Sequence, residues 1–105
     1  MRRSYKKPFE QFVKKAHKPL RLAIEDQVEI VCETPYAGEQ KEGDLAGFYV
    51  HKFSFNRQQY LLAYLPPSED QLGNASLIEF LVIDFYKIDT HENFYDELKR
   101  YVKGE

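Results

Sequence analysis

Residues 91 to 99 combine side chains that can accept, donate or neutralise charge, at a spacing typical of one helix face. His91, Tyr95 and Lys99 follow one another at intervals of four residues. The positive end of a helix dipole disfavours an imidazolium, so His91 at a helix start is expected to be neutral and able to accept a proton. Tyr95 can donate a proton or stack on a planar ring. The pattern indicates a proton-transfer site, with a capping histidine and a packed tyrosine as the alternative.

A second group of candidates lies in a predicted strand, Phe48 to Phe55, and in the turn that follows it. Aromatic and β-branched residues are frequent here, and a period of two places His51 on one face and Lys52 on the other. Lys52 is therefore a cation projecting from a strand, and a solvated strand residue is the alternative. Arg57, in the turn at residues 56–58, is either solvated or in contact with a ligand.

Two helices at the start of the chain and one at its end are predicted to support these residues. Residues 8–16 form a short amphipathic helix opened by Pro8, and a second helix restarts at Pro19 and ends at Thr34-Pro35. Together they make a helical hairpin. The last helix is capped by Asp89 or Thr90 and carries its apolar residues at i, i+4, i+7 and i+8.

Three strands lie between the hairpin and the last helix. They are joined by short connections, which favours an antiparallel sheet with the helices on one face, in an α+β domain. The longest strand is apolar on both faces in its middle, so further structure is expected to cover its second face. The segments are a loop at 35–47, strands at 48–55, 59–65 and 77–88, and a loose connection at 68–75.

Composition excludes several classes of protein. The chain has 105 residues, which fits a single domain over residues 1–105. Apolar runs such as Phe80 to Ile83 are far shorter than the roughly 20 residues of a membrane span, and no signal peptide follows Arg2-Arg3, so we expect a cytoplasmic protein. Cys32 is the single cysteine, which excludes an internal disulfide and makes a structural metal improbable. We expect no metal and no cofactor.

Charge is divided unevenly along the chain. The whole chain carries a net charge of −2, yet residues 1–21 contain eight basic residues and one acidic residue. A pI near 5.9 argues against an extended nucleic-acid-binding surface, and a local basic stripe in the hairpin is compatible with it. The acidic face of the second helix fits either solvent or a basic partner segment. The basic stripe comprises Lys14, Lys15, Lys18 and Arg21, and the acidic face comprises Glu25, Asp26, Glu29 and Glu33.

Three runs of residues resemble the RelE/ParE superfamily of bacterial type II toxins, in its HigB/RelE-like branch. The resemblance implies a RelE-like fold, in which a helical hairpin packs on a small antiparallel sheet of three to four strands with a C-terminal helix. The extra strand would come from Met1 to Tyr5 and be short or missing. The runs are KEGDLAGFYVHKF at 41–53, YLLAY at 60–64, and HENFY at 91–95 followed by LKR at 98–100.

The resemblance also implies a target and a partner. Members are neutralised by a cognate antitoxin protein, and they act on mRNA at the ribosome or, in the ParE branch, on DNA gyrase. Cleaving RNA without a metal requires a base, a cation and an acid. The resemblance assigns these tasks to His91, Tyr95 and Lys52, with Lys52 holding the phosphate. RNA or ribosome contacts would come from His51, Arg57, Lys99, Lys14, Lys15, Lys18 and Arg21.

Departures from the RelE pattern leave alternatives open. Val50 and Leu61 stand where RelE-like toxins carry basic residues, and Asp96 adds a negative charge beside Tyr95. Either the chemistry depends on His91 and Lys52, or the chain is weakly active or inactive as a nuclease. An endoribonuclease that blocks translation is the leading hypothesis. A non-enzymatic gyrase inhibitor is the alternative, and a degenerate toxin that only binds its antitoxin is the third.

Overall fold

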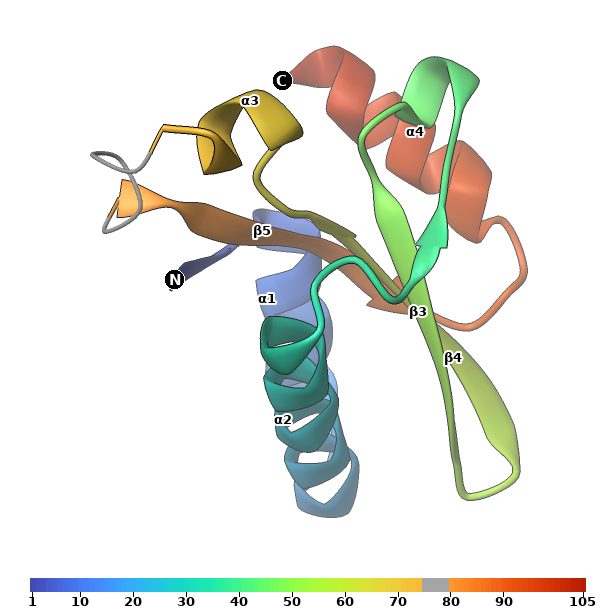
Figure 1. Cartoon of the computed structure of the whole chain (residues 1–105). Helices are drawn as coiled ribbons and strands as arrows, with labels where there is room; N and C mark the ends of the chain where they lie inside the picture. The colour runs from blue at the N-terminus through green and yellow to red at the C-terminus, as the bar shows by residue number, and fades with distance from the viewer. Residues whose placement is uncertain (75–79) are drawn as a thin grey trace.

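A computed structural model of the chain, which describes residues 1–74 and 80–105, has a twisted five-stranded sheet with helices on both faces (Figure 1). The strand order is β1-β5-β4-β3-β2. Strand β1 runs parallel to β5, and the other neighbours are antiparallel. The strands are β1 (Arg2–Tyr5), β2 (Glu39–Gln40), β3 (Tyr49–Phe55), β4 (Gln58–Leu65) and β5 (Val82–Asp89).

The hairpin helices start where the sequence provides helix-starting residues. A proline stands in the first turn of each, where its missing N–H costs no hydrogen bond. The ring Nδ1 of His17 also accepts a hydrogen bond from the Leu20 N–H at 3.3 Å, which caps α2. The helices are α1 (Lys7–Lys15), α2 (Lys18–Glu33), α3 (Glu69–Leu72) and α4 (Phe94–Gly104), with a 3₁₀ turn η1 at Gly43–Leu45.

Two apolar cores lie on opposite faces of the sheet. The first is formed between the sheet and the α1–α2 hairpin, with Phe85 and Leu62 fully buried in it. The second is formed between the sheet and α4, around Phe94, Leu98, Leu61 and Ala63. In Figure 1 the hairpin and α4 lie on opposite sides of the strands. The sheet is therefore the middle layer of three, which explains why β5 is apolar on both faces.

The structure corrects the expected sheet in two respects. The sheet has five strands, not three to four, because β2 lies within the segment predicted as a loop at 35–47. The sheet is mixed and not antiparallel, because β1, which was expected to be short or missing, is present and pairs in parallel with β5. The helices occupy both faces, whereas the sequence predicted one. Alternation along β3 and β4 provides an apolar side chain on each face, so each face needs its own cover.

Three boundaries also differ from the expected ones. A short helix, α3, lies within the predicted connection at 68–75, because Ser68 and Gln71 form a reciprocal capping box. The third long strand runs from Val82 to Asp89, and the part of its predicted range at 77–79 lies outside the described residues. Helix α4 begins at Phe94 after Asn93, whose φ of 59° is left-handed, and not after Asp89 or Thr90.

Candidate functional site

A chain of contacting polar side chains joins β2, β3 and the start of α4. The Nζ of Lys52 lies 3.2 Å from Oε2 of Glu39, and the Nζ of Lys41 lies 2.6 Å from Oε1 of the same carboxylate. Lys41 Nζ is also 4.6 Å from the centroid of the Tyr95 ring. The His91 ring meets Tyr95 edge to face at 6.0 Å. These five residues, here called the 39–95 cluster, connect Lys52 to His91 through side chains from three parts of the chain.

Local structure explains how the cluster is assembled. Strand β2 pairs with β3, with Glu39 opposite Val50 and Gln40 opposite Tyr49, which brings the loop before η1 next to Lys52. The left-handed Asn93 turns the chain into α4, so His91 precedes the helix instead of lying on it. The expected shared helix face of His91, Tyr95 and Lys99 is therefore wrong. His91 and Tyr95 meet through this turn, and their rings are in contact.

Electrostatics within the cluster favour the charged forms of its ion pairs. The hydrogen bond to Glu39 raises the pKa of Lys41, and the Tyr95 side chain adds a smaller effect in the same direction. The hydrogen bonds from Lys41 and Lys52 lower the pKa of the Glu39 carboxyl. The cluster thus presents two ammonium groups around one carboxylate, beside an imidazole and a phenol, which are groups suited to proton transfer and anion binding.

Sequence reasoning missed Glu39, and it named Lys41 only as part of a motif. Both lie in a segment without periodicity that was predicted as a loop. The alternation of charges at Glu39, Lys41 and Glu42 was the available signal. That signal could not show which of the acids faces Lys52, because this depends on the pairing of β2 with β3.

The two apolar departures from the RelE pattern are buried beneath α4. Val50 is 1% exposed and Leu61 is 0% exposed, and both pack in the second core with Phe94 and Leu98. Neither side chain can contact a substrate while α4 is in place. Their apolar character is explained by packing, and the cationic charge of the site comes from the β2–β3 side.

Helix α4 is held over the sheet by a nearly buried lysine. The Nζ of Lys87 lies 3.8 Å from Asp89, 3.9 Å from Glu97 and 5.9 Å from the centroid of the Phe94 ring. Two carboxylates and an aromatic face compensate the cost of burying this ammonium. Lys87 therefore acts in positioning α4.

Lys99 and Asp96 line a depression outside the 39–95 cluster. With Asp44, Arg100, Val102 and Lys103, they line a hollow of about 650 Å³ between the η1 loop and α4. Lys99 is the continuation of the α4 face that the sequence predicted, and no contact joins it to His91 among the described residues.

His51 lies on the opposite face from Lys52, as the alternation predicts, and therefore outside the 39–95 cluster. Its ring Nε2 is 2.6 Å from Oε1 of Gln27 on α2, and its ring stacks on Phe53 at 6.3 Å. Burial lowers the pKa of His51 from its usual 6.5. The structure places His51 against the hairpin, apart from Lys52 and the rest of the 39–95 cluster, and this packing accounts for its burial.

We expect this buried imidazole to weaken the fold in acid. Below about pH 6.5 the unfolded chain binds a proton at His51 that the folded chain resists, so stability falls as the pH falls. Urea midpoints measured at about pH 7.5 and about pH 5.5 should decline less for His51→Gln than for the wild type. An equal decline in both proteins would show that His51 does not contribute.

The basic residues of the hairpin lie away from the 39–95 cluster. Lys14, Lys15, Lys18 and Arg21 are exposed on α1 and α2, which cover the other face of the sheet. The His17 ring lies 6.1 Å from Phe55, so the α1–α2 junction and the turn with Arg57 are at the same end of the molecule. Arg57 has a left-handed φ of 66°, in the tight turn between β3 and β4. The sequence-predicted contacts thus separate into a basic end and a cluster of possible catalytic groups.

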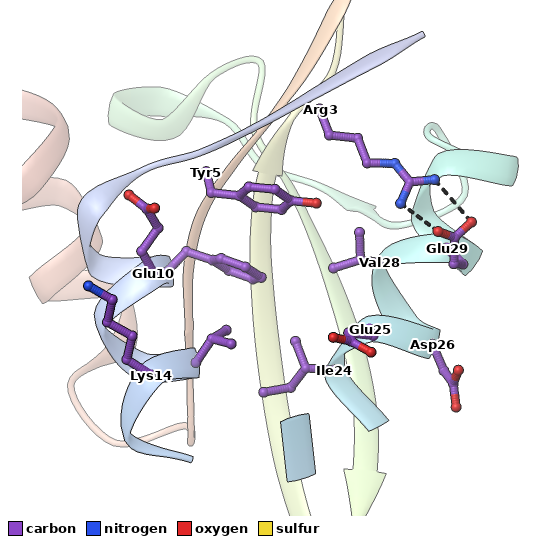
Figure 2. Close-up of a pocket in the computed structure, with 11 residues that line it drawn as sticks. Arg3, Tyr5, Glu10, Lys14, Ile24, Glu25, Asp26, Val28 and Glu29 are labelled. Carbon is purple, nitrogen blue, oxygen red and sulfur yellow. Dashed lines mark hydrogen bonds and ion pairs between the residues drawn. The ribbon is translucent and has the colours of Figure 1, made fainter. Parts of the chain in front are cut away.

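A groove of about 640 Å³ lies between β1, α1 and α2 (Figure 2). Apolar side chains line its floor, with the Tyr5 and Phe9 rings stacked at 5.3 Å. Acidic residues of α2 lie along its side, where Glu29 is paired with Arg3 by hydrogen bonds of 2.5 and 3.0 Å. The other lining residues are Glu10, Val13, Lys14, Ile24, Glu25, Asp26 and Val28. Four of the lining residues are acidic and two, Arg3 and Lys14, are basic, so the groove has an apolar floor and a mainly acidic border.

Metal-binding groups and membrane-spanning helices are both absent from the described residues, 1–74 and 80–105. No three histidine, cysteine or carboxylate side chains in this part of the chain are grouped so that they could hold a metal ion. None of its helices has the length and apolar character needed to cross a membrane.

The chain is similar in sequence and in fold to known bacterial toxins. The model of a family described as ParE-like toxin of type II bacterial toxin–antitoxin systems matches residues 4–99. The toxin–antitoxin complex RelBE of E. coli superposes with a TM-score of 0.60 at 14% identity, covering 87% of this chain and 96% of that chain. The isolated E. coli RelE toxin gives a TM-score of 0.58 at 16% identity, covering 95% and 97%. No curated protein sequence matches the chain.

Proposed function

Because the chain belongs to the ParE-like toxin family of type II bacterial toxin–antitoxin systems, within the RelE/ParE superfamily, we propose that it is a toxin that cleaves mRNA at the ribosome. The observation that supports cleavage is the 39–95 cluster, which groups a histidine, a tyrosine and two lysines from three parts of the chain. The similarity of fold to RelE agrees with this proposal.

The proposed reaction needs no metal. His91 removes the proton of a ribose 2′-hydroxyl, and the 2′-oxygen then attacks the neighbouring phosphorus atom. Lys52 neutralises the charge that develops on the phosphate oxygens. The departing 5′-oxygen takes a proton from Tyr95 or, if Tyr95 instead stacks on the adjoining base, from solvent water. The products are a 2′,3′-cyclic phosphate and a free 5′-hydroxyl.

Primer extension on a defined mRNA in a reconstituted translation reaction tests the proposal. Cuts within the codon that awaits decoding, seen only when ribosomes are present, would support it. Intact mRNA with demonstrably folded protein would contradict it.

A second candidate function is inhibition of DNA gyrase without catalysis. The observation in its favour is that Val50 and Leu61 are buried and uncharged, while the ammonium of Lys52 is paired with Glu39. A site with so little free positive charge stabilises the charge on a reacting phosphate poorly. Binding to a protein such as gyrase does not require that charge. Loss of gyrase supercoiling in the presence of the protein, together with intact mRNA, would favour this candidate.

We further propose that a cognate antitoxin occupies the groove between β1, α1 and α2. Helices pack on both faces of the sheet in the described part of the chain, whereas this groove is open to a partner. The apolar floor and acidic border fit a cationic amphipathic helix. Native mass spectrometry with the product of the adjacent reading frame should show a complex. Binding there without any toxic activity would indicate a degenerate toxin.

A further inference from the structure

We propose that Lys41 and Lys52 form a phosphate-binding site beside Tyr95, and that the Glu39 carboxylate occupies this site in the unbound protein. The inference rests on the proposed function and deepens it. It adds a second cation to the site and identifies an internal competitor for the substrate's phosphate.

The Glu39 carboxylate and a substrate phosphodiester can present two oxygens in the same way. Each oxygen of the Glu39 carboxylate contacts a different ammonium, Oε1 with Lys41 at 2.6 Å and Oε2 with Lys52 at 3.2 Å. Two oxygens on one central atom are also what a phosphodiester presents to its ligands. A phosphate placed where the carboxylate now lies can therefore bind both lysines without a change in their positions.

The Glu39 side chain can move away from the ammonium groups of Lys41 and Lys52. Its side chain is 51% exposed, and that of Lys52 is 45% exposed, so this ion pair is solvated and contributes little to stability. Glu39 lies on a strand of two residues at the sheet edge, with no third partner among the described residues. A substrate phosphate, which carries its own charge and further contacts, can displace it.

Lys41 lies close to the proposed reacting groups, Tyr95 and His91. The Lys41 side chain is only 21% exposed, and its ammonium lies 4.6 Å from the Tyr95 ring centroid. The ring also touches His91. A phosphate on Lys41 is thereby adjacent to the tyrosine and histidine, whereas Lys52, in the described part of the chain, is connected to them through Glu39 and Lys41. Lys41 is the cation that ties phosphate binding to the rest of the cluster.

The test measures binding separately from cleavage. A dye-labelled single-stranded RNA with 2′-O-methyl riboses cannot be cut, so fluorescence anisotropy at low ionic strength reports only affinity. We expect Glu39→Gln to bind roughly fivefold more tightly than the wild type, because an anion that competes with phosphate is removed. Lys41→Ala should bind more weakly, and its slope of log affinity against log salt should fall by about 0.7, as for one lost phosphate contact.

Matched variants control for charge alone. Glu42→Gln is the control for Glu39→Gln, because it removes the same charge from the same loop. Lys7→Ala is the control for Lys41→Ala, because it removes a lysine from the far side of the molecule. Neither Glu42 nor Lys7 forms an ion pair in the described part of the chain. Equal effects of Glu39→Gln and Glu42→Gln, or of Lys41→Ala and Lys7→Ala, would overturn the proposal. So would undetectable binding by the wild type and Glu39→Gln alike.

The outcome also separates this inference from the proposed function. Affinity that follows Glu39 and Lys41, in a protein that leaves translated mRNA intact, would support the phosphate site and contradict the nuclease. Ribosome-dependent cleavage by a protein whose affinity is indifferent to both residues would support the nuclease and overturn the phosphate site.

Discussion

Replacing His91 by alanine is expected to lower the rate of ribosome-dependent mRNA cleavage by about 10²- to 10⁴-fold, the usual contribution of a general acid or base. The reason is that His91 is the imidazole of the 39–95 cluster, in contact with Tyr95 through its ring edge. His91 is exposed and lies before α4 begins, so its removal should not disturb the packing. Single-turnover primer extension on stalled ribosomes measures the effect.

Two further variants make the His91 result interpretable. Glu92→Ala changes the next exposed residue and should cleave at the wild-type rate. His91→Gln keeps a polar side chain of similar reach but cannot exchange a proton near neutral pH, so it should be as slow as the alanine variant. Wild-type cleavage by His91→Ala would remove the histidine from the mechanism and would leave gyrase inhibition as the better account of toxicity.

Replacing Phe94 by alanine is expected to destabilise the protein by about 3–5 kcal/mol, as for other fully buried phenylalanines. The Phe94 side chain is 0% exposed, packs between α4 and the sheet, and provides the aromatic face beside Lys87. The loss is a large part of the roughly 5–15 kcal/mol that folds a domain of this size. Urea unfolding monitored by circular dichroism gives the free energy.

The chain contains a matched control for this substitution. Phe80 is 61% exposed, so Phe80→Ala deletes the same side chain at the surface and should change stability by less than about 0.5 kcal/mol. Because Phe94 lies next to Tyr95 and ahead of Leu98, loss of its packing should also release α4 and abolish activity. A stable, active Phe94→Ala protein would mean that α4 is not needed to hold the cluster.

Much of the fold could be predicted from periodicity. The hairpin helices were expected at 8–16 and from Pro19 to Thr34, and they lie at Lys7–Lys15 and Lys18–Glu33. The strands at 48–55 and 59–65 were placed within a residue of β3 and β4. The opposite orientations of His51 and Lys52 were confirmed, since alternation along a strand depends on local geometry alone.

The features that sequence reasoning missed or left open depend on partners far away in the chain. Strand β1 was expected to be short or missing, since it has four residues and no apolar run, and it is a strand because β5 provides its hydrogen bonds. Glu39 belongs to the candidate site only because two residues of β2 pair with β3. The start of α4 depended on a left-handed Asn93, a conformation that few residues other than glycine adopt. Such choices are made by tertiary contacts, which a pattern in one segment does not contain.

The parallel pairing of β1 with β5 has a consequence for synthesis of the chain. Strand β1 finds its partner only when residues 82–85 have also emerged from the ribosome. Pairings of such long sequence separation close slowly, because the intervening chain loses conformational freedom before the contacts form. The two hairpin helices can form early, yet they lack most of the sheet against which they pack. The sheet is therefore incomplete until β5 has emerged, and the antitoxin proposed to bind beside the hairpin would have the whole of that interval in which to bind it.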